Sequence, residues 1–147
     1  MLAKLAIAFV IMASDFAQAG QAGGYEAATA EEIAPGSHCF VLASYAIEQI
    51  KAQSNSLTLM QKSFDKVLSM EHQVVAGTNY RIRAHLQPSG LMSLSVFEQP
   101  WTQTLEVTEA TLTPTDDSSA ITTLVGASSH LRLDAAEFAK RLEMAQP

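Results

Sequence analysis

The sequence has a single cysteine, Cys39, in 147 residues. One thiol excludes an intramolecular disulfide and every scaffold that depends on several of them. In a secreted chain an odd thiol either pairs between molecules or is buried, and Cys39 falls at the start of a helical apolar pattern, which favours burial. No motif in the chain supplies the base that an activated thiol needs, so a nucleophilic role is not expected.

The sequence also lacks an excess of positive charge and any cluster of metal-ligand residues. Nine Lys and Arg stand against 15 Asp and Glu, and the net charge of -6 gives a nucleic-acid partner no electrostatic support. The histidines have no ligand spacing with one another, with the cysteine or with a carboxylate cluster; they are His38, His72, His85 and His130. We therefore expect no metal, no other cofactor and no enzymatic activity.

The N-terminal apolar run, residues 5–13, is too short to span a bilayer. Lys4 precedes it, and Ala17-Gln18-Ala19 follows with the small-x-small pattern of a cleavage site. This arrangement predicts a signal peptide at residues 1–19 and a secreted protein, in the extracellular space or the endomembrane lumen. A membrane anchor or an amphipathic helix is the alternative.

Residues 20–36 are rich in alanine and glycine and show no periodicity, which predicts a flexible N-terminal arm. Ser37 is a candidate N-cap for a helix that ends near Gln53. Apolar residues follow at helical spacing and form one stripe: Cys39, Leu42, Ala43, Ala46 and Ile50.

Strand patterns fill the middle of the chain. Residues 57–75 predict one long, bent strand, whose apolar face we assign to Phe64, Leu68, Met70 and Val74. Residues 78–86, 92–97 and 104–108 alternate apolar and polar side chains, and short turns connect them. Residues 37–111 are therefore expected to form one α+β domain, with a long helix packed across a four- or five-stranded antiparallel sheet.

Residues 112–147 are expected to form a C-terminal extension that is partly disordered. Asp116 and Asp117 indicate a linker, and residues 121–125 are a short apolar run of uncertain type. A short helix is predicted to start near Asp134.

Three features of the chain have the character of exposed binding elements: Gly23-Gly24, the apolar run at residues 73–77, and Pro100-Trp101. Hairpin tips are normally polar, so an apolar tip suggests a partner. The meander places both tips at one end of the sheet, where they could form a wedge with the arm. The alternative is that Trp101 belongs to the core and that the valines lie inside a strand.

The run Gln73-Val74-Val75-Ala76-Gly77 resembles the Gln-x-Val-x-Gly signature of the cystatins, inhibitors of papain-like cysteine proteases. The preceding glycine pair, the helix segment at residues 42–48 and the later Pro100-Trp101 also match that family in order, from Gly23 to Thr108. The resemblance implies a cystatin-like fold and a reversible, tight-binding inhibitor that fills the protease cleft without a covalent bond. It assigns protease binding to Gly23, Gly24, Gln73, Val74, Val75, Ala76, Gly77, Pro100 and Trp101.

The chain also departs from family patterns. Secreted animal cystatins generally carry two disulfides, and Ser44 stands where plant forms commonly have an arginine, so a disulfide-free, plant-like or lower-eukaryote form is implied. Some secreted cystatins inhibit the protease legumain through an asparagine in the loop after the helix, and Asn55 matches it by position. The alternative for Asn55 is a turn residue, and the alternative for the whole chain is a cystatin-fold binding module without strong inhibition.

Overall fold

The computed structural model describes residues 24–114, 121–126 and 128–146. The predicted signal peptide, Gly23 and the linker at Asp116 and Asp117 lie outside these residues. In the described part, seven strands form one antiparallel sheet in the order β1-β2-β3-β4-β5-β6, and β7 pairs with β5. The strands are β1 Glu26–Ala27, β2 Ser63–Val75, β3 Gly77–Gln87, β4 Leu91–Gln99, β5 Thr104–Thr113, β6 Thr122–Val125 and β7 Leu131–Arg132.

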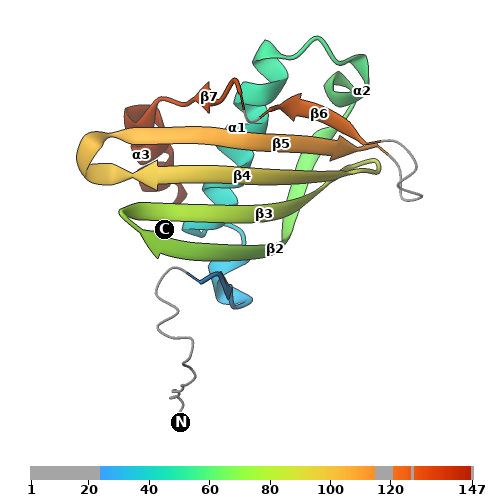
Figure 1. Cartoon of the computed structure of the whole chain (residues 1–147). Helices are drawn as coiled ribbons and strands as arrows, with labels where there is room; N and C mark the ends of the chain where they lie inside the picture. The colour runs from blue at the N-terminus through green and yellow to red at the C-terminus, as the bar shows by residue number, and fades with distance from the viewer. Residues whose placement is uncertain (1–23, 115–120, 127, 147) are drawn as a thin grey trace.

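A long helix, α1 (His38–Gln53), lies across one face of this sheet (Figure 1). Ser37 caps it as predicted, because the Ser37 hydroxyl accepts a hydrogen bond from the Phe40 amide at 3.2 Å. The predicted apolar stripe is buried along its whole length. The α+β class is therefore confirmed, although the sheet has seven strands in the described part of the chain rather than four or five. None of the helices among the described residues combines the length and apolar character needed to cross a membrane.

The central meander, β2 to β5, has the order and antiparallel pairing that the sequence predicts. Its inner face supplies much of the core, through Ile82, Ala84, Leu86, Met92, Leu94, Val96, Leu105, Val107, Ala110 and Leu112. A bulge in β5 opposite Ser95 and Val96 leaves Thr108 without a partner in the register. Because of that extra residue, Val107 and Ala110 both reach the core despite their odd spacing.

The predicted face of β2 is partly wrong. Leu68 is 45% exposed, whereas Val67 is only 6% exposed. A register shift between Val67 and Ser69 causes the difference, since the inserted residue changes which side chains point inward. The bend that the sequence predicts in this strand is confirmed by that shift and by another between Phe64 and Lys66.

The segment predicted as the start of this strand is instead a short helix, α2 (Leu57–Met60). The Ser56 hydroxyl accepts a hydrogen bond from the Leu59 amide, and the Leu59 side chain is fully buried. One capped turn therefore places Leu59 in the core, and the strand begins only at Ser63.

The N-terminal arm, where it is described, has regular structure that was not predicted. Two residues form β1 on the edge of β2, and a 3-10 turn, η1 (Glu31–Ile33), follows. Thr29 and Glu32 hold that turn through reciprocal hydrogen bonds: the Thr29 amide donates to Glu32 Oε1, and the Glu32 amide donates to Thr29 Oγ1.

The C-terminal segment packs on the same core. Helix α3 (Ala135–Ala145) confirms the predicted helix, and the Asp134 carboxylate caps it through the amides of Ala136 and Glu137. Val125, Leu133 and Phe138 are all buried in the core. Helix α3 lies against α1 beside the β4–β5 turn (Figure 1).

Candidate functional site

The first hairpin tip, residues 73–77, connects β2 to β3. Val75 pairs with Gly77 and leaves Ala76 alone at the turn. Gly77 has a φ of +122°, and a Cβ atom there would lie 2.7 Å from the Phe97 ring and 2.8 Å from the Glu98 carbonyl oxygen. This tight reversal therefore requires glycine, and it leaves Val74 and Val75 67% and 45% exposed.

Gln73 lies at the base of the first tip. Its side-chain oxygen accepts a hydrogen bond from Asn79 Nδ2 at 2.9 Å, across the β2–β3 pair. The glutamine of the motif thus ties the two strands together immediately before the exposed valines.

The second tip, residues 100–103, connects β4 to β5. Pro100 begins a 3-10 turn, η2 (Pro100–Thr102), and Gln103 closes it in the left-handed conformation with a φ of 54°. The Thr102 hydroxyl lies 3.1 Å from the Gln99 carbonyl oxygen and 2.7 Å from Gln99 Oε1. These short-range bonds fix the turn, and Trp101 projects from it with 69% of its surface exposed.

The two tips lie at the same end of the sheet and contact each other (Figure 1). Gln99 Nε2 donates a hydrogen bond to the Ala76 carbonyl oxygen at 2.8 Å, which links the second tip to the first. We call the exposed apolar residues that result the apolar edge: Val74, Val75, Ala76, Pro100 and Trp101. The alternative that Trp101 belongs to the core is therefore wrong. Val74 and Val75 do lie inside a strand, at the end of β2, but their side chains are exposed.

The N-terminal arm approaches this edge. Glu26 pairs with His72 and Ala27 with Glu71, so the arm is antiparallel to β2, and Glu26 is the nearer of these two residues to the first tip. The Arg81 guanidinium lies 3.7 Å from the centre of the Tyr25 ring and holds that part of the arm on the sheet. Gly24 is exposed, whereas Gly23 lies outside the described residues.

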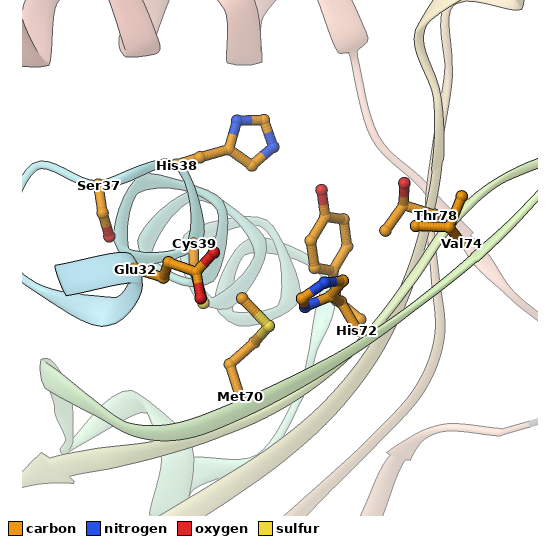
Figure 2. Close-up of a pocket in the computed structure, with 9 residues that line it drawn as sticks. Glu32, Ser37, His38, Cys39, Met70, His72, Val74 and Thr78 are labelled. Atoms are coloured by element: carbon orange, nitrogen blue, oxygen red, sulfur yellow. The ribbon is translucent and has the colours of Figure 1, made fainter. Parts of the chain in front are cut away.

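Beneath the first tip a pocket of about 350 Å³ opens between the start of α1 and β2 (Figure 2). Glu32 and Ser37 lie on one side of it, and Val74 and Thr78 lie on the other. The remaining residues that line it are His38, Cys39, Met70, His72 and Tyr80.

The residues that line the pocket include neither an activated nucleophile nor a set of metal ligands. Burial, with a further contribution from the charge of Glu32, raises the pKa of the Cys39 thiol to about 12, so the thiol stays protonated. Cys39 is 1% exposed, which confirms the prediction of a buried thiol. Among the described residues, no group of three or more His, Cys, Asp or Glu could hold a metal ion.

A partly buried carboxylate, that of Glu98, lies two residues before the second tip. Glu98 Oε1 accepts hydrogen bonds from His38 Nε2 and from the Tyr80 hydroxyl, each at 3.0 Å. Burial by itself raises the pKa of the Glu98 carboxyl, but the bonds from His38 and Tyr80 outweigh it, and the pKa lies below its ordinary value. Glu98 and Gln99 were not predicted as site residues, and their position next to Pro100-Trp101 in the sequence was the signal that could have revealed them.

Asn55 lies at the opposite end of α1 from these tips. It is exposed in the loop between α1 and α2, where the Ser56 amide bonds to the Ser54 hydroxyl at 3.0 Å. The 16 residues of α1 span about 24 Å. Asn55 is therefore separate from the apolar edge, and the structure does not bring it together with the other predicted site residues.

A scan against models of known protein families, a search of curated proteins and a search of solved structures each found no match to this chain. A function for this chain is therefore inferred from its own residues and geometry.

Proposed function

We propose that this protein is a reversible, tight-binding inhibitor of papain-like cysteine proteases, with a cystatin-like fold. The observation that carries the proposal is the apolar edge: two hairpin tips, linked by the bond from Gln99 to Ala76, that expose Val74, Val75 and Trp101 at one end of the sheet. The motif at residues 73–77 and the later Pro100-Trp101 resemble the corresponding cystatin elements, and the two tips would enter the primed side of the cleft.

The edge suits a wedge because it is apolar and already ordered. Burial of a large apolar side chain contributes roughly 1.5–3 kcal/mol, and a surface that is fixed before binding avoids part of the entropic cost of association. Gln99, Gln103 and Thr102 fix the second tip, and Gly77 fixes the first. Gly24 and the arm before it would reach the non-primed subsites.

The first test is an inhibition assay against papain. We expect the purified protein to inhibit papain reversibly with one molecule per active site, and activity should return on dilution because no covalent bond forms. The readout is the residual hydrolysis of a peptide substrate at increasing protein concentration, together with the intact mass of the protein after incubation. No inhibition at micromolar concentration would instead favour a binding module that lacks strong inhibition.

A second inhibitory site at Asn55 is favoured by its exposure in a loop far from the apolar edge. An exposed asparagine side chain can enter a pocket that recognises its amide, as legumain requires. We expect Asn55→Lys to abolish inhibition of legumain and to leave inhibition of papain unchanged. If the wild type does not inhibit legumain, or if Asn55→Lys still inhibits it, Asn55 is a turn residue and not an inhibitory site.

We further propose that the protein is secreted, on the basis of the sequence pattern at residues 1–19. N-terminal sequencing of the protein from the culture medium of a eukaryotic host should then begin at Gly20.

A further inference from the structure

The second tip lies over open space. A groove of about 340 Å³ separates it from α3, and both Pro100 and Gln103 line this groove. From α3, the groove is lined by Ala135, Ala136, Phe138, Ala139 and Leu142. The packing beneath the tip is therefore incomplete, so contacts of neighbouring residues would add to the Gln99 and Thr102 bonds that fix the turn.

Glu98 provides such a contact. It is two residues before Pro100 on β4, and its side chain is 13% exposed. An ionised carboxylate can only accept hydrogen bonds, so His38 Nε2 and the Tyr80 hydroxyl are the donors in this cluster. The end of β4 is thereby connected to the start of α1 and to the neighbouring strand β3.

His38 extends the connection to the C-terminal helix. Its ring packs edge-on against Phe138 of α3 at 5.1 Å, and Phe138 is 2% exposed. Two further contacts hold α3 on α1: Arg141 forms a two-pronged ion pair with Glu48 at 2.6 and 3.0 Å, and the Tyr45 hydroxyl donates to the Asp134 carbonyl oxygen. Helix α3 thus supports the residue that reaches Glu98.

We propose that Glu98 is a positioning residue that holds the second tip in its binding conformation, and that α3 contributes to this role through His38. The effect on inhibition rests on the proposed function above, whereas the effect on the tip does not. Helix α3 lies outside the part of the chain that resembles the cystatins, so this role makes the C-terminal segment part of the inhibitor.

Trp101 gives a direct readout, because it is the single tryptophan of the chain. In Glu98→Ala, we expect time-resolved fluorescence anisotropy of the free protein to show a larger amplitude of fast local motion at Trp101. The affinity for papain should fall about tenfold, equivalent to about 1.4 kcal/mol. Glu98→Gln keeps an acceptor oxygen and should stay within about threefold of the wild type.

Asp65→Ala is the matched control. It removes a similar carboxylate–histidine contact, Asp65 with His85 at 2.9 Å, near the other end of β2 and β3. We expect it to leave both the motion of Trp101 and the affinity unchanged. If Glu98→Ala is unstable, His38→Ala replaces it, because His38 is 44% exposed and its loss should loosen Trp101 in the same direction.

Wild-type anisotropy in both Glu98→Ala and His38→Ala would overturn the positioning role. An equal increase in Asp65→Ala would also overturn it, since the loosening would then be general. If the wild type does not inhibit papain but Glu98→Ala still loosens Trp101, the proposed function fails and the positioning of the tip stands.

Discussion

Replacing Gly77 with alanine is expected to destabilise the protein by about 3 kcal/mol and to abolish most of the papain inhibition that we propose. The backbone at Gly77 has a φ of +122°, and the added Cβ would lie within 2.8 Å of the Phe97 ring and of the Glu98 carbonyl oxygen. Because Phe97 and Glu98 lead directly into the second tip, the same clash should displace both tips. Urea unfolding measures the free energy, and papain inhibition measures the displacement.

Gly126→Ala is the control for this substitution. A Cβ atom at Gly126 would meet no atom within 4 Å, and its φ lies outside the left-handed region. We expect its free energy of unfolding to stay within about 0.5 kcal/mol of the wild type. A Gly77→Ala protein as stable and as inhibitory as Gly126→Ala would mean that the first tip does not have this tight geometry at Gly77.

Replacing Trp101 with alanine should weaken binding to papain by on the order of 2 kcal/mol, or about 30-fold, with little change in stability. Trp101 is 69% exposed in the free protein, so its removal leaves no cavity in the core. In a complex, its large apolar surface would be buried and lost to the variant. Inhibition constants and thermal unfolding of the same preparations separate the two effects.

Leu57→Ala provides the comparison for Trp101→Ala. Leu57 is 78% exposed, but it lies on α2, after the C-terminal end of α1 and away from both tips. Its loss should not change papain inhibition. Equal losses in Leu57→Ala and Trp101→Ala would indicate nonspecific contact through exposed apolar residues rather than a defined edge.

Local patterns predicted the parts of the fold that depend on local spacing. The stripe from Cys39 to Ile50 predicted α1 and its buried face, and strict alternation from Tyr80 to Leu86 predicted β3. The apolar character of residues 73–77 also correctly indicated an exposed tip. Nothing in the local structure of a hairpin turn requires valines, so their presence there pointed to a binding surface.

Features that depend on inserted residues or short caps were missed. The exchange of Leu68 for Val67 in the core follows from a bulge, and alternation cannot reveal where a strand gains a residue. The turn at Ser56–Leu59 rests on one hydroxyl cap, and the turn at Thr29–Glu32 rests on one pair of reciprocal bonds. Such short caps are a weak signal beside strand-like or alanine-rich neighbours.

The long-range contacts at the site could not be predicted from the sequence either. The bond from Gln99 to Ala76 and the path from Phe138 through His38 to Glu98 join residues that are 23 to 100 positions apart. Only the register of the sheet and the packing of α3 bring them together. The exposed tips at residues 73–77 and at Pro100-Trp101 were therefore predictable individually, but the contacts that hold them in place were not.

The most direct test of a cleft-binding edge compares two forms of papain by isothermal titration calorimetry. One has a free active-site cleft, and the other has the cleft filled on both its primed and its non-primed side by a covalent peptidyl inhibitor. If the apolar edge enters the cleft, the protein will bind free papain with one-to-one stoichiometry and will show no measurable binding to the filled form. Equal affinity for both forms, or binding to neither, would contradict the proposed function.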